Sequence, residues 1–214
     1  MAAPKQVILT AGFLLIASMA TTPASADDQL PIMPPAYLTN SVIDGSVFSG
    51  ANGNIAVNLA AGDANVQLNA ASLATSFGGG IARAGVYGFQ FTEKIGASPD
   101  SAICTIGGNA FANVSGLTAI NQASGQGNAQ ANGVAIALGL GGGEAIAESC
   151  LSAISTGQWP VTTNDTNNTI RQASVEKTAF VGASGLVQIN QLAGSGNATA
   201  NNFAVRVSLG GAPD

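Results

Sequence analysis

The chain has 214 residues, of which 46% are apolar and 8% are charged, and its formal net charge is −5. Its six basic residues are scattered, which argues against a nucleic-acid-binding surface because such a surface needs clustered Lys and Arg. The sequence has no histidine, and this excludes Ser-His-Asp and Cys-His catalytic arrangements.

Residues 1–26 have the pattern of a signal peptide. Lys5 precedes a short apolar run that ends at Ile16, and Ala24–Ser25–Ala26 forms a small-residue cleavage pattern. The run is shorter than the ~20 residues of a transmembrane helix, although an anchor that stays uncleaved is the alternative. We therefore expect export from the cytoplasm by way of the periplasm. The proline-containing segment 27–45 predicts a flexible leader.

One pattern occurs three times, in segments 46–79, 111–142 and 179–211. The copies share identical residues at eight of thirty-two aligned positions without a gap. Three of these positions carry asparagine, namely Asn58/Asn121/Asn190, Asn65/Asn128/Asn197 and Asn69/Asn132/Asn201, and one carries phenylalanine, Phe48/Phe111/Phe180. An internal repeat of this length is typical of a stacked, one-dimensional architecture.

Each copy contains two stretches in which the side chains alternate between two faces, as in β-strands, and a polar bend lies between the two stretches. In the first copy, Val57 and Leu73 represent the two alternating stretches, and Gly62 begins the bend between them. A simple hairpin is one interpretation. A β-arch, in which the strands face each other through side chains and pair with neighbouring copies, is favoured because stacked asparagines form amide ladders. The sequence predicts an all-β fold, a β-solenoid of three stacked arches joined by irregular linkers.

These periodicities predict two groups of functional residues. The nine asparagines above are the expected self-assembly ladder. The expected repeat core consists of one phenylalanine and two aliphatic residues per copy: Phe48, Val57, Leu73, Phe111, Ile120, Ile136, Phe180, Ile189 and Val205. An end rung without a polar cap presents unpaired backbone groups to another chain. We therefore expect polymerisation.

The linkers, 80–110 and 143–178, are too long for tight turns. The alternating stretch 84–91 predicts an extra strand in the first linker, and Glu144–Glu148 in the second is compatible with helix or strand. Cys104 and Cys150 lie on either side of the second repeat. In an exported protein they predict one disulfide, with free thiols as the alternative.

The segment Gly53–Asn65 resembles the repeat of the Fap-type functional amyloid subunits of pseudomonads, and Gly125–Asn128 resembles the curlin repeat. The resemblance implies export through an outer-membrane pore, followed by assembly with itself and with related subunits into cross-β biofilm fibres. The Cys-x-x-Cys pair of the major Fap subunit is absent, and the copies diverge, as at Asp63, Gln126 and Ser195. These departures favour a minor or fibre-associated subunit.

Other functions have weaker support in the sequence. The acidic residues are scattered singly, so no catalytic dyad is expected, and we expect no enzyme activity, cofactor, metal or small-molecule substrate. The glycine-rich stretches lack the Lys-Ser/Thr of a P-loop. The alternative function is a cell-surface adhesin with a β-solenoid fold that does not polymerise.

Overall fold

The computed structural model describes residues 36–94, 98–155 and 169–208. Within these residues every regular element is a β-strand, which confirms the predicted all-β class. The eleven strands are β1 (Leu38–Ile43), β2 (Asn52–Ala61), β3 (Val66–Ser76), β4 (Ala82–Lys94), β5 (Ser101–Ile106), β6 (Ser115–Ser124), β7 (Ala129–Gly139), β8 (Gly143–Ser155), β9 (Ile170–Val175), β10 (Ser184–Ala193) and β11 (Ala198–Ser208).

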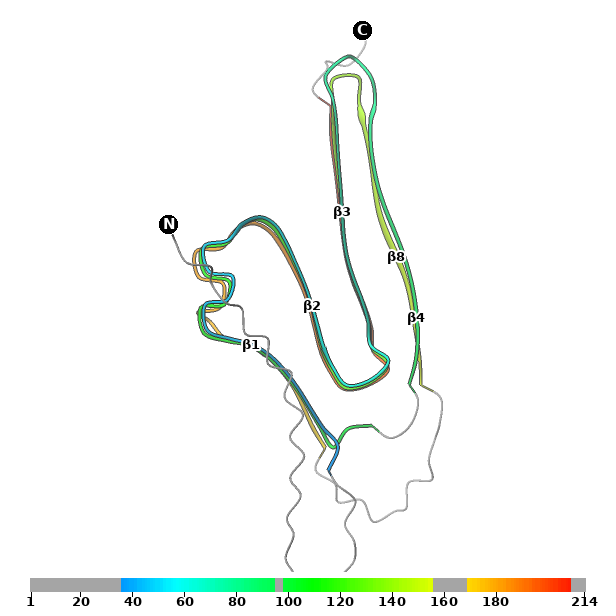
Figure 1. The fold of residues 1–214 in the computed structure, drawn as a ribbon. Coiled ribbons are helices and arrows are strands. Elements are labelled where there is room, and N and C mark those ends of the chain that lie inside the picture. Colours follow the sequence, from blue (N-terminus) through cyan, green and yellow to red (C-terminus); the bar gives the residue numbers. More distant parts are fainter. Residues whose placement is uncertain (1–35, 95–97, 156–168, 209–214) are drawn as a thin grey trace, which may run out of the picture.

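The strands are arranged in three layers, which we call rungs. Rung 1 consists of β1–β4, rung 2 of β5–β8 and rung 3 of β9–β11. Figure 1 looks along the stack, so that the three rungs nearly overlie one another. Within a rung the chain reverses direction between successive strands, and these strands face each other through their side chains, as in the predicted β-arch.

Hydrogen bonds join strands of different rungs into four parallel sheets. Sheet A contains β1, β5 and β9, sheet B contains β2, β6 and β10, sheet C contains β3, β7 and β11, and sheet D contains β4 and β8. The register places equivalent residues of the repeats directly beside one another, for example Asn58 beside Asn121 and Asn121 beside Asn190. This arrangement is the predicted solenoid of stacked arches.

Three different layers of side chains fill the space between neighbouring sheets. An apolar cluster around Phe111 and Ile120 lies between sheets A and B and under the turns that connect them. Amide side chains join sheets B and C, as the bond from Asn132 to Asn121 shows. Alanines such as Ala135 pack between sheets C and D.

The rungs extend beyond the three repeats into segments expected to be irregular. The leader segment 27–45 contains β1, and the linkers contain β4, β5, β8 and β9. The stretch 84–91 is a strand, as predicted, and Glu144–Glu148 is extended within β8. Side-chain identity does not reveal these strands because their pairing depends on backbone hydrogen bonds between unlike residues, such as Phe89 beside Cys150. The predicted signal peptide lies outside the described residues.

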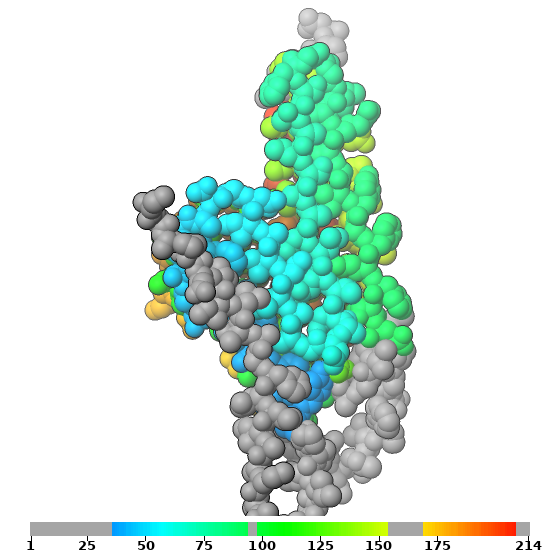
Figure 2. All heavy atoms as spheres, viewed as in Figure 1, coloured from blue at the N-terminus to red at the C-terminus, as the bar shows by residue number. Residues whose placement is uncertain are grey.

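The middle rung is the buried one. Residues Thr118–Ala135 of rung 2 are all buried, whereas the matching residues of rungs 1 and 3 are largely exposed or half-buried. In Figure 2, viewed along the same direction, the coloured atoms that face the viewer are mainly those of rung 1. The two outer rungs therefore each present one open face.

Candidate functional site: the asparagine and glycine columns

The nine predicted asparagines form three columns that run along the stack. Column 1 lies on sheet B and consists of Asn58, Asn121 and Asn190. Column 2 lies on sheet C and consists of Asn69, Asn132 and Asn201. Column 3, which lies in the turns between these sheets, consists of Asn65, Asn128 and Asn197.

Columns 1 and 2 face each other and form one network. Within rung 2, the Asn132 amide nitrogen donates to Asn121 Oδ1 at 3.0 Å and to the Ile120 carbonyl at 3.1 Å. Between rungs, the Asn121 amide donates to Asn58 Oδ1 at 3.0 Å and to Asn69 Oδ1 at 3.0 Å. Buried amides are costly unless paired. Here each neighbouring rung supplies a partner, so the columns favour identical rungs in register.

Column 3 holds the turn between the two sheets. The Asn128 amide donates to Asn65 Oδ1 at 2.8 Å and to the Gly194 carbonyl at 3.0 Å. The backbone nitrogen of Asn128 donates to the same Asn65 oxygen at 3.1 Å. The bonds from Asn197 to Asn128 repeat this pattern one rung further on. One asparagine per rung therefore fixes the turn and joins it to both neighbours.

The asparagine columns have a direction. In every asparagine-to-asparagine bond between rungs, the amide nitrogen of the later rung donates to the amide oxygen of the earlier rung. Rung 1 therefore presents amide donors at its open face, and rung 3 presents amide oxygens at its open face. The two ends of the stack are chemically complementary.

Glycines beside the columns permit the close approach of successive rungs. Gly125 has a φ of +122°, a backbone conformation that favours glycine. A Cβ atom at Gly125 would overlap the carbonyl oxygen of Gly194 in the next rung, and one at Gly62 would overlap the carbonyl oxygen of Gly125. The repeated glycines are therefore required by the stacking itself.

Buried glutamines, which were not predicted from the sequence, extend the amide network. Gln122 is fully buried, and its amide donates to the Ser41 carbonyl at 2.8 Å and to the Thr105 carbonyl at 3.0 Å. These bonds join sheet B to sheet A. Gln130 donates to the Gln122 carbonyl at 3.0 Å. The available signal was glutamine at equivalent positions in two of the three copies.

The phenylalanines form a stacked column. The ring centroids of Phe48 and Phe111 are 5.0 Å apart with an interplanar angle of 13°, and those of Phe111 and Phe180 are 5.1 Å apart with an angle of 3°. Phe111 and Ile120 are fully buried. The four predicted core residues that are partly buried and pack against this cluster are Phe48, Val57, Phe180 and Ile189.

The other predicted core residues, Leu73, Ile136 and Val205, lie outside both hydrophobic clusters. Leu73 is 70% exposed, and Ile136 and Val205 are half-buried. The reason is geometric. Sheets B and C meet at the turn and diverge with distance from it, so here the face of sheet C that is turned toward sheet B has no closely opposed sheet (Figure 1).

The disulfide predicted between Cys104 and Cys150 is absent, and both residues are free thiols. Cys104 belongs to sheet A and Cys150 to sheet D, and sheets B and C come between them along the rung. Cys104 is fully buried, and its thiol donates to the Leu192 carbonyl at 2.9 Å. Burial raises the pKa of Cys104 to about 12, since the thiolate would lose its solvation.

Metal-binding clusters and membrane-spanning helices are both absent from the described ranges 36–94, 98–155 and 169–208. In these ranges no group of three or more His, Cys, Asp or Glu side chains is placed to hold a metal ion. No helix in them is long and apolar enough to cross a bilayer.

Comparison with known proteins gives one family match. Residues 19–208 match the model of a family described as the functional amyloid protein FapB/FapC family. The functional amyloid subunit FapC of Pseudomonas aeruginosa is 37% identical over 131 residues. This alignment covers 58% of the chain and 37% of FapC, so the chain spans little more than a third of that relative. No solved structure matches. Because the family match covers most of the sequence, the chain belongs to the functional amyloid protein FapB/FapC family.

Proposed function

We propose that this protein is an exported structural subunit that assembles head to tail into a cross-β fibre of a bacterial biofilm. Rung 1 of one copy stacks on rung 3 of the preceding copy, and sheets A, B and C continue across the junction. The partners are further copies and related fibre subunits, and export uses a signal peptide, the periplasm and an outer-membrane pore. Membership of a functional amyloid family and the printed name of the FapC relative support this function.

The residues of the outer rungs are the main structural support. Rungs 1 and 3 keep the asparagine, glycine and phenylalanine positions that join rung 2 to both of its neighbours. A capping rung of a monomeric solenoid would instead carry a polar outer face. The open faces are therefore suited to a further rung of the same kind.

The direction of the asparagine columns also supports head-to-tail growth. The amide donors of Asn58, Asn65 and Asn69 in an incoming rung 1 would face the amide oxygens of Asn190, Asn197 and Asn201 in the preceding rung 3. The same donor and acceptor arrangement already joins rung 2 to rung 1. A head-to-head junction would bring donors against donors, so the columns favour one mode of addition.

A buried hydroxyl on rung 3 points to the same junction. Among the described residues, Thr199 Oγ1 is buried without a hydrogen-bond partner. Thr199 shares its column with Gln130 and Gln67, whose side chains are hydrogen-bonded to each other at 2.6 Å. Head-to-tail stacking brings Gln67 of the next copy beside Thr199, where its amide would complete the column.

Replacement of column 3 by alanine tests this function. The variant Asn65→Ala/Asn128→Ala/Asn197→Ala should still be exported, but its fibre growth should slow at least tenfold because each rung loses its bonds to both neighbours. The matched control, Asn40→Ala/Asn54→Ala/Asn109→Ala, changes three exposed asparagines outside the columns. The measurement is seeded elongation followed by thioflavin fluorescence. Equal growth of both variants would contradict the assembly role of column 3.

A second variant and fibre diffraction test the stack more directly. Val57→Asp/Ile120→Asp/Ile189→Asp should block assembly, because each rung would place a charge in the apolar layer. Diffraction from wild-type fibres should show reflections near 4.7 and 10 Å. A chain that remains a soluble monomer at high concentration would instead favour the adhesin alternative.

A further inference from the structure

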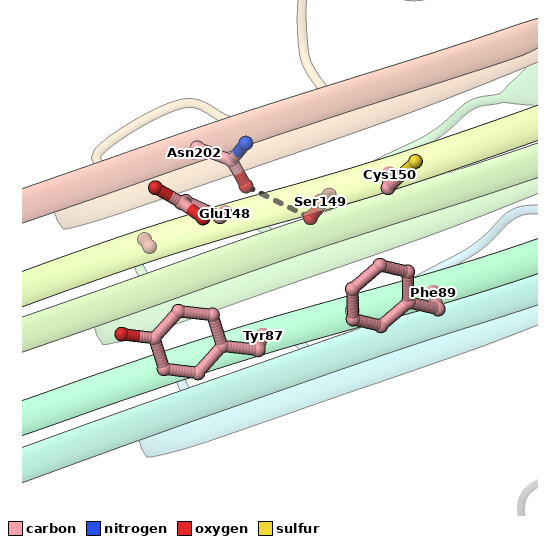
Figure 3. Close-up of a pocket in the computed structure, with 8 residues that line it drawn as sticks. Tyr87, Phe89, Glu148, Ser149, Cys150 and Asn202 are labelled. Atoms are coloured by element: carbon pink, nitrogen blue, oxygen red, sulfur yellow. Dashed lines mark hydrogen bonds between the residues drawn. The ribbon is translucent and has the colours of Figure 1, made fainter.

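The outer face of sheet D carries an exposed aromatic stripe. Tyr87, Phe89 and Phe91 alternate along β4, and their side chains are 60%, 83% and 62% exposed. The intervening residues, such as Ala84 and Val86, are buried against sheet C. Figure 3 shows the rings of Tyr87 and Phe89 as neighbours on β4, with Glu148 and Cys150 on the adjacent strand β8.

The stripe is complementary to itself. When two copies of β4 face each other antiparallel about an axis at Gly88, Tyr87 of each copy lies opposite Phe89 of the other. Phe91 lies opposite Gly85 of the other copy, and the ring of Tyr87 in that copy lies next to its Gly85. At the ends of the stripe, Arg83 lies opposite Glu93. In its own subunit Arg83 is already ion-paired with Glu144 at 2.8 Å, so Glu93 would be its second acidic neighbour. Aromatic groups thus face aromatic groups, and opposite charges face each other at both ends.

Strand β8 shares the same axis. Gly88 is the register partner of Ser149, so the antiparallel pairing also places Glu148 opposite Cys150 of the second copy, and no acidic side chain of rung 2 has to face another directly. A depression in the surface lies beside this axis (Figure 3). It is lined by Tyr87, Phe89, Glu148 and Cys150 and extends past the edge of β8 to Asn202 on β11. It leaves room at the axis for the rings of an opposing sheet.

We propose that sheet D pairs with sheet D of a second copy through this stripe, so that two stacks of subunits lie side by side in one fibre. This inference rests on the proposed function, because the pairing axis runs along the direction of stacking. Rung 1 then faces rung 1 and rung 2 faces rung 2. The partner is another copy of this chain.

The size of the surface explains why pairing belongs to the stack and not to single subunits. Fully covered aromatic side chains bury about 150–250 Å² each, so the exposed fractions given above leave roughly 300–500 Å² per copy. Two copies would then bury at most roughly 1,000 Å², less than the ~1,200–2,000 Å² of a stable interface. Successive subunits in a stack repeat the contact, so two stacks bind each other through many weak contacts and their combined affinity is high.

The first test removes the aromatic stripe. Phe89→Lys/Phe91→Lys should still form fibres, but their mass per unit length, measured by scanning transmission electron microscopy, should fall twofold. The matched control is Leu73→Lys/Phe77→Lys, which replaces two rung 1 residues that are each 70% exposed elsewhere. The control should keep the wild-type mass per length. An unchanged value in the stripe variant would overturn the inference.

The second test uses the charges at the ends of the stripe. The test is made in a Glu144→Gln background, because Arg83 forms an ion pair with Glu144 of its own subunit at 2.8 Å. In this background, Arg83→Glu should separate the stacks, because the introduced carboxylate would face Glu93 of the second copy. The double variant Arg83→Glu/Glu93→Arg should restore the wild-type mass per length. Only antiparallel pairing of the face with itself predicts this rescue, so double-variant fibres that stay single would overturn the proposed pairing.

Other outcomes separate this inference from the function on which it rests. Wild-type fibres that contain a single stack would overturn sheet D pairing and leave head-to-tail assembly intact. Single-stack fibres that bind phosphatidylglycerol vesicles in a Phe89-dependent manner would assign the face to a membrane instead. Failure of the wild-type chain to form any fibre would contradict the proposed function and the pairing together.

Discussion

The two faces of sheet C are packed in opposite ways. Toward sheet B, Asn132 is buried and its amide bonds to three oxygen atoms, those of Asn69, Asn121 and Ile120. Toward sheet D, Ala135 and Ala137 are fully buried among other alanines. One strand, β7, supplies both sets of side chains.

The difference lies in what each layer requires from the neighbouring rungs. An amide needs a partner at a fixed distance and direction, so column 2 is asparagine in all three rungs. Alanine packing needs only a small volume. The column of Ala137 therefore accepts Arg206 in rung 3, where no sheet D strand is described opposite it. Directional contacts lead to identical residues, and packing contacts lead to similar sizes.

The strongest way to break the amide layer is Asn121→Leu. Asn121 is fully buried and bonded to Asn58, Asn69, Asn132 and Asn190. Each buried group left unpaired costs about 1–3 kcal/mol, so the free energy of unfolding should fall by about 3–6 kcal/mol. Guanidinium unfolding followed by circular dichroism measures this change. The control Asn109→Leu, at an exposed position, should change it by less than about 0.5 kcal/mol. Equal effects would refute the amide network.

The alanine layer should respond to volume. Ala135→Leu should cost about 1–3 kcal/mol by overpacking the space between sheets C and D. Ala204→Leu is the matched control, since Ala204 lies in the same column but is exposed on rung 3. The same unfolding measurement should show little change for this control. A stabilising effect of Ala135→Leu would mean that the two sheets are loosely packed.

Asn58→Ala sharpens the comparison between the middle and outer rungs. Asn58 is exposed at the open face of rung 1. Water can there replace the Asn58 oxygen that accepts from Asn69 and Asn121, so the expected cost is about 1 kcal/mol. Seeded elongation should slow more strongly than this stability change suggests, because the variant removes a donor from the growing junction. Elongation at the wild-type rate would argue against rung 1 as the incoming face.

The smallest effect at neutral pH concerns the thiols. Iodoacetamide at pH 8 should modify the exposed Cys150 and leave the buried Cys104 unmodified until the chain unfolds, as mass spectrometry would show. Because burial raises the pKa of Cys104 to about 12, the unfolded chain releases this proton first. The free energy of unfolding should therefore be unaffected below about pH 9 and fall between about pH 9 and 12. Cys104→Ala should remove this part of the pH dependence.

Part of the candidate site could be predicted from the sequence because each column repeats one residue type. Asn58, Asn121 and Asn190 are recognisable in sequence since each must bond to its own kind. The alternating residues 84–91, which predicted the strand β4, were equally recognisable in the sequence. Gln122 was harder to recognise. Its amide donates to the backbone carbonyls of Ser41 and Thr105, which any residue can supply, and in its column only Gln191 repeats the glutamine and bonds to it.

The sequence alone determined the register of stacking, because a slip of one residue would separate every asparagine, glycine and phenylalanine from its counterpart. Only the tertiary structure decided the path of each rung, since backbone pairing of β4 with β8 needs no matching side chains. The same path decided burial. Leu73 and Phe89 alternate like core residues, but one lies where two sheets diverge and the other on the outer face of sheet D.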